Sequence, residues 1–171
     1  MPELSIDLTQ WVGIAVFAAA AIACLAASRV RPVAWRLLAA LQVSCCVEVV
    51  WGVRYQLHNE ADLVLQGQGR YEGCHPLQLT PIGIVLLLAV AGAAGIVWRA
   101  RRLNAGLAGA LLGTLLTGAL FDLETVSLHD IDATMYAVVG PIKAIDWMWA
   151  GVAAITIASA VRGARESAGR R

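Results

Sequence analysis

The sequence has few charged residues for its length. Only 15% of its 171 residues are Asp, Glu, Lys or Arg, whereas 59% are hydrophobic, and the mean hydropathy is +0.69. A small soluble domain cannot bury this much apolar surface, because much of the surface of so short a chain stays in contact with water. The composition therefore excludes an ordinary soluble domain and indicates a protein of the lipid bilayer.

The chain also lacks the short motifs of several enzyme classes. It has no Cys-x-x-Cys pair, no His-Glu-x-x-His motif, no phosphate-binding glycine loop and no Gly-x-Ser-x-Gly turn. Membrane thiol oxidoreductases and serine hydrolases are disfavoured on this ground. Four cysteines and a net charge of +1 likewise give no reason to expect a disulfide framework or a nucleic-acid partner.

Long apolar runs take the place of such motifs. Most of them approach the roughly 20 residues that a helix needs to cross the hydrocarbon core. We expect one all-α domain over residues 1–171, a polytopic bundle of five transmembrane helices. The expected spans are residues 10–28, 37–57, 81–98, 103–121 and 141–161.

The charges at the ends of these runs predict an orientation. Arginines follow the first, third and fifth runs, whereas most acids precede the first run or follow the second and fourth. Lys and Arg in short loops stay on the cytoplasmic side, so we expect the N-terminus outside and the C-terminus inside a multi-pass protein of the cell membrane. The acidic start, residues 1–7, is unlike a secretory signal, and the first run is expected to be a retained helix.

The longer loops are predicted to form an extracytoplasmic cap from residues 58–80 and 122–140. The second helix is expected to continue into the first loop for a few turns. In the second loop, Ser127 and Asp130 match a capping box, which predicts a short helix from about Leu128 to Val139.

Small residues recur at every fourth position of the fourth run. They are Ala105, Gly109, Gly113 and Thr117. Such a stripe lets helices approach closely, within one chain or between two chains of a homo-oligomer.

Glu48 is the most informative single residue. It lies twelve residues beyond Arg36, about 18 Å along a helix, and so within the hydrocarbon nearer the outer face. An acid at that depth is expected to face the protein interior or a wet cavity. The alternative is a hydrogen-bonded packing residue. Around Glu48, a polar stripe at helical spacing includes Ser44, Trp51, Gly52, Tyr55, His58 and Asn59.

A second polar group follows the fourth run. If that helix continues beyond the membrane, Asp122, Thr125, His129 and Asp132 share one face. We expect His129 and at least one of Asp122 and Glu124 to converge with the Glu48 stripe in one outer-facing pocket. The alternative is a solvated acidic loop that only obeys topology.

All three histidines lie on the predicted outer side, near acids. Imidazole with carboxylate suits a divalent metal as well as general acid/base catalysis. The candidate metal ligands are His58, His129 and Asp132.

The favoured hypothesis is a small membrane enzyme with an extracytoplasmic acid/base site, metal-assisted in one version, that acts on a lipophilic, isoprenoid-like substrate. Glu48 is the predicted proton donor, and Asp122, Glu124 and His129 are the other predicted catalytic residues. The candidate substrate-binding residues are Trp51, Arg54, Tyr55, Tyr136, Trp147 and Trp149.

Two other classes stay open. One is a non-enzymatic accessory subunit or assembly factor, whose cap docks a partner in a larger membrane complex. The other is an oligomeric transporter of ions or small molecules, in which Glu48, Lys143 and Asp146 would lie along the ion path.

Overall fold

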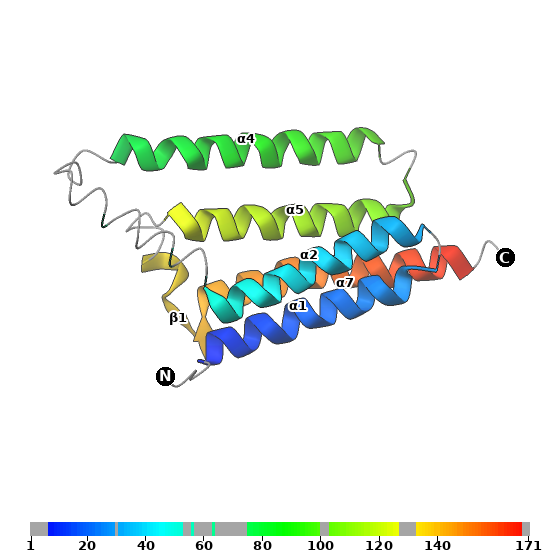
Figure 1. Cartoon of the computed structure of the whole chain (residues 1–171), viewed down its shortest axis with the longest axis horizontal. Helices are drawn as coiled ribbons and strands as arrows, with labels where there is room; N and C mark the ends of the chain where they lie inside the picture. Colours follow the sequence, from blue (N-terminus) through cyan, green and yellow to red (C-terminus); the bar gives the residue numbers. More distant parts are fainter. Residues whose placement is uncertain are drawn as a thin grey trace.

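The structure is a computed structural model that describes residues 7–29, 31–52, 56, 63, 75–99, 103–126 and 133–168; of residues 75–82, 85, 99 and 126 it gives the helical backbone alone. Long helices run side by side along the longest axis of the molecule (Figure 1). They are α1 (Leu8–Ala27), α2 (Pro32–Trp51), α4 (His75–Arg99), α5 (Ala105–Val126) and α7 (Ala144–Ala168). Two short strands, β1 (Val138–Val139) and β2 (Ile142–Lys143), precede α7.

The predicted all-α class is confirmed in the described part of the chain. Four of the helices, α1, α2, α5 and α7, are long and apolar enough to cross a membrane. In α4, the described apolar stretch is the shorter Leu86–Trp98. The chain therefore has the helices of a multi-pass membrane protein, and α4 as a fifth span stays a prediction.

The core lies among α1, α2, α5 and α7. Helix α1 packs against α2 and α7, and α5 packs against α7 on one side and α4 on the other. Figure 1 shows α4 as the outermost helix, separated from α1 and α7 by α5. Buried residues form one cluster around Trp35, Leu38 and Ala160, and a second around Phe17 and Trp149.

Helices α5 and α7 pack most closely where both carry small residues. A Cβ added to Gly106 would meet the backbone of Gly163, and one added to Gly113 would meet Thr156. Gly109 likewise lies against Ser159. The small-residue stripe of α5 therefore serves packing within one chain. We call this contact the α5–α7 seam.

The first residue of the predicted stripe needs a correction. Ala105 is exposed, and its neighbour Gly106 makes the contact with α7. The physical reason is the helical period of 3.6 residues, which turns a strict four-residue repeat slowly away from a neighbouring helix.

Helix α2 ends earlier than expected. It stops at Trp51, where Gly52 adopts the left-handed conformation with φ 58° and ψ 38°, and the Gly52 N–H bonds to the Glu48 carbonyl at 2.7 Å. Glycine takes this conformation without a Cβ clash and commonly ends helices in this way. The polar stripe predicted around Glu48 assumed one continuous helix, and that helix is interrupted at Gly52.

The helix expected up to Val139 also ends early. Residues 133–135 are helical, but Val138 pairs with Lys143 and Val139 with Ile142 in an antiparallel hairpin. Gly140 turns the chain at φ 68°. As a result α7 begins at Ala144, after the hairpin, and not at Pro141.

Candidate functional site at the acidic end

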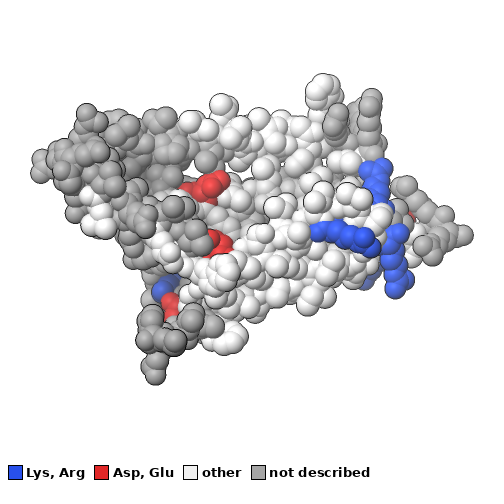
Figure 2. Space-filling view, in the orientation of Figure 1, with Lys and Arg blue, Asp and Glu red and all other residues white. Residues whose placement is uncertain are grey.

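Charge separates to the two ends of the described bundle. Figure 2 shows most Lys and Arg side chains gathered at one end, and acidic side chains toward the other. Lys143 lies at the acidic side, with its Nζ 4.0 Å from Asp7 Oδ2. The arginines whose side chains are described lie where α1 and α7 end and α2 begins: Arg29, Arg31, Arg36, Arg162 and Arg165. The opposite end, here called the acidic end, carries Asp7, Glu48, Asp122, Glu124 and Asp146. Glu166 lies among the arginines and pairs with Arg162 at 2.8 Å.

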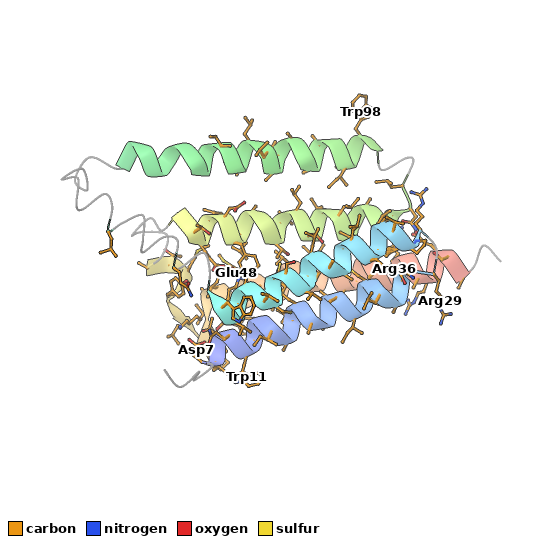
Figure 3. The ribbon with its side chains drawn as sticks, in the orientation of Figure 1. Asp7, Trp11, Arg29, Arg36, Glu48 and Trp98 are labelled. Atoms are coloured by element: carbon orange, nitrogen blue, oxygen red, sulfur yellow. The ribbon has the colours of Figure 1, made fainter. Side chains whose placement is uncertain are left out.

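Glu48 lies at the acidic end of α2, as predicted. Figure 3 shows it at the same end as Asp7 and far from Arg29 and Arg36. Its side chain is half-buried. It lies on a helix that packs against α1 and α5, and its depth in the hydrocarbon stays a prediction.

Glu124 is fixed by a buried tryptophan. The Trp149 Nε1 donates a hydrogen bond to Glu124 Oε1 at 2.8 Å, and Trp149 is only 4% exposed. Its ring packs against Phe17 and Phe121, with centroid distances of 6.0 and 5.9 Å. A hydrogen bond to a carboxylate from a rigid aromatic side chain holds that carboxylate in one orientation.

The close packing of Trp149 depends on a glycine. A Cβ added to Gly13 of α1 would lie 2.8 Å from the Trp149 ring and 3.0 Å from Val49. Trp149 was a candidate substrate-binding residue, but the structure places it in the core, where it positions Glu124.

Asp122 borders an open groove in the bundle. An open, mostly apolar groove of about 420 Å³ lies between α2, α4 and α5. Helix α5 supplies a stripe of lining residues at spacings of three and four, which is the spacing of one helix face. The lining residues are Leu38, Leu41, Leu88, Ala89, Ile96, Leu111, Thr114, Leu115, Gly118, Ala119 and Asp122. Of the predicted catalytic residues, Asp122 lines this groove, and its carboxylate is exposed at the end nearest the acidic end.

The other described aromatic candidates lie on the outside of the bundle. Trp51 is 66% exposed, and Tyr136 and Trp147 are also exposed. Trp147 Nε1 donates to the Val139 carbonyl at 3.0 Å, and Lys143 Nζ lies 5.6 Å from the centre of the Tyr136 ring. Exposed tryptophan and tyrosine at one end of a bundle are typical of an aromatic belt at the membrane surface.

Asp146 has a structural role at the start of α7. It is 1% exposed, and its Oδ2 accepts a hydrogen bond from the Lys143 backbone N–H at 2.9 Å. A carboxylate in the first turn that bonds back to the residue before the helix stabilises the helix N-terminus. Lys143 in turn lies 4.0 Å from Asp7 across a smaller cavity of about 270 Å³. Asp146 therefore caps α7 through Oδ2, while its Oδ1 is buried and has no hydrogen-bond partner among the described residues. An ion path through Asp146 and Lys143 stays a prediction.

A polar pair, Gln42 and the groove residue Thr114, was missed in the sequence. Gln42 lies in the middle of α2 with no exposed surface, and its Nε2 donates to Thr114 Oγ1 at 3.2 Å. An amide side chain in the middle of an apolar run was the available signal, because such a residue is costly in lipid and needs a polar partner.

The remaining predicted residues lie outside the described residues. They are Arg54, Tyr55, His58, His129 and Asp132. The predicted metal site and the expected meeting of His129 with Glu48 therefore stay predictions. Among the residues that the structure describes, no group of three or more His, Cys, Asp or Glu side chains is placed to hold a metal ion. No protein-family model, curated protein or solved structure matches the chain.

Proposed function

We propose that the protein is a membrane enzyme that holds the apolar chain of a lipid-like substrate in the α2–α4–α5 groove and acts on its polar end with carboxylates at the acidic end. The observation that carries the proposal is the groove itself, apolar along its length and bordered by Asp122. Ligand sites typically combine an apolar lining with a few placed polar groups.

The dimensions of the groove support a single lipid chain. From Leu111 to Asp122, its lining residues on α5 are separated by eleven residue-to-residue steps, which correspond to about 16 Å of helix. That length is close to half of the roughly 30 Å hydrocarbon core, so the groove has the depth of one leaflet. The polar end of a lipid held there would lie beside Asp122.

The chemistry proposed is proton transfer between carboxylates and the substrate. A positioned carboxylate can accept or donate a proton in the transition state, and two carboxylates in different surroundings can divide these roles. Asp122 is exposed, Glu48 is half-buried, and Glu124 is held by Trp149. A divalent metal at His58, His129 and Asp132 would be an addition that this mechanism does not require.

The proposed orientation has the acidic end outside, since arginines favour the cytoplasmic side. Single cysteines at Arg29 and Lys143, in a background where the native cysteines are replaced by alanine, would test it. A membrane-impermeant maleimide applied to intact cells is expected to label position 143 and spare position 29. The reverse pattern would overturn the orientation.

The groove is tested by filling it. Gly118 lines the groove and has no atom within 4 Å of an added Cβ, so Gly118→Leu places a side chain in the groove. Gly151, on the exposed surface of α7, is equally open, which makes Gly151→Leu a matched control. Mass spectrometry of lipids that remain bound to purified protein is expected to detect a lipid with wild type and Gly151→Leu, and at least about tenfold less of it with Gly118→Leu.

Asp122→Asn tests the acidic end separately. It should bind the lipid more weakly and lose its conversion, because the apolar chain still fits while the carboxylate that holds the polar end and exchanges the proton is gone. Equal lipid content in wild type and Gly118→Leu would contradict the proposal.

The accessory-subunit hypothesis also has support. Helix α4 packs mainly against α5, and Leu86, Leu87, Val90, Val97 and Trp98 are exposed on it, with Trp98 at 87%. Figure 3 shows Trp98 directed away from the bundle. Lipid or a partner helix could cover this face. Native mass spectrometry of mildly solubilised protein is expected to give the mass of the single chain with lipid; a stoichiometric second protein would favour the subunit hypothesis.

A further inference from the structure

We infer that Thr114, held by its hydrogen bond from Gln42, is a donor in the groove about 12 Å from Asp122 and selects a lipid that carries a carbonyl oxygen within its chain. The inference rests on the proposed function, because it assigns chemistry to the ligand of the same groove. It adds a specificity-determining residue, Thr114, and a positioning residue, Gln42.

Only one of the two polar atoms of the Gln42 side chain makes a hydrogen bond. It has no exposed surface and sits near the middle of α2. Its Nε2 bonds to Thr114, whereas its Oε1 is buried and bonds to nothing within the described residues. A buried amide costs free energy at membrane depth, and the one contact that this side chain makes is with Thr114, whose hydroxyl it holds in place at the groove.

Thr114 differs from the other threonines of α5 and α7. Thr117, Thr125 and Thr156 each donate their hydroxyl to the carbonyl oxygen four residues earlier, the usual arrangement in a helix. The Thr114 hydroxyl instead accepts the bond from Gln42, and in the described part of the chain it donates none. A donor is thus left available on a residue that lines the groove.

The two polar positions of the groove define the ligand. Thr114 and Asp122 lie on the same face of α5, eight residues and about 12 Å apart. The Asp122 carboxylate suits an amine or hydroxyl at the end of the chain. The Thr114 hydroxyl donates, so it suits an acceptor such as a keto or ester oxygen about 12 Å further along the chain. The lining between these two positions is apolar.

Two probes distinguish this inference from the groove proposal. One is hexadecylamine, and the other is the same amine with a keto oxygen about 12 Å from the nitrogen. Their binding would be measured by native mass spectrometry of the full chain in lipid nanodiscs, over a series of probe concentrations. Wild type is expected to bind the keto amine about fivefold more tightly, the factor that one net hydrogen bond supplies.

Thr114→Val removes the hydroxyl and leaves a side chain of nearly the same shape. The variant is expected to bind both probes with the affinity that wild type shows for hexadecylamine. Thr117→Val is the matched control, since Thr117 is buried and bonds to its own helix, and it should keep the fivefold preference. Asp122→Asn should lower the binding affinity for both probes by a similar factor.

The outcomes separate the two ideas. If wild type binds both probes equally, or if Thr114→Val keeps the preference, the inference is overturned while the groove remains a lipid site. If wild type binds neither probe, the groove proposal fails and the inference fails with it.

Discussion

The two faces of α5 use glycine in opposite ways. Toward α7, Gly106, Gly109 and Gly113 allow contact so close that an added Cβ would meet backbone or side-chain atoms. Toward α4 and the groove, Gly118 has no atom within 4 Å of an added Cβ. The same residue type therefore gives tight packing on one face and open space on the other. In a membrane, where helix association depends on close packing, the first face stabilises the bundle and the second borders an open groove.

The largest difference between the faces should appear on substitution by leucine. Gly106→Leu is expected to destabilise the protein by about 3 kcal/mol or more, since backbone atoms of Gly163 cannot move aside. Gly118→Leu should change stability by less than about 1 kcal/mol, because its side chain enters open space. Thermal unfolding in detergent measures both. Similar melting temperatures for the two variants would show that the α5–α7 seam is looser than described.

The seam was the part of the fold that the sequence predicted best. A stripe of small residues indicates a close helix contact, but the four-residue repeat could not show whether the partner was another helix of the same chain. The structure supplies that partner, in Thr156, Ser159 and Gly163 of α7. The sequence also predicted the gathering of acids at one end, since charge patterns follow helix ends.

The groove could not be predicted, because it depends on the tertiary positions of three helices. Gln42 and Thr114 come from separate runs, and no spacing rule connects residues 72 positions apart. The burial of Trp149 was missed for a similar reason. Tryptophan near the end of an apolar run usually marks the membrane surface, and only the packing with Phe17 and Gly13 places this one in the core.

A second comparison uses the two tryptophans of α7. Trp149→Phe removes the hydrogen bond to Glu124 and some buried volume, so a loss of about 2 kcal/mol is expected. Trp147→Phe also removes a hydrogen bond, to Val139, but at an exposed position, and it should cost less than about 0.5 kcal/mol. Unfolding in a graded series of SDS concentrations would measure the difference. A larger loss for Trp147→Phe would mean that the hairpin, not the aromatic core, fixes this end of α7.

The smallest effect on stability is expected for substitution of Gln42, a residue that we infer to act in ligand recognition. Gln42→Leu loses one hydrogen bond between helices, which averages about 0.6 kcal/mol in a membrane protein. It also removes the buried Oε1 atom, which bonds to nothing in the described chain, and replaces it with apolar surface of similar size. These terms nearly cancel, so the variant should be as stable as wild type or slightly more stable, by less than about 1 kcal/mol. The melting temperature in detergent would measure this. A fall of several degrees would make Gln42 a structural residue of the bundle, whereas an unchanged value leaves recognition of a ligand as the reason to keep an amide in the hydrocarbon.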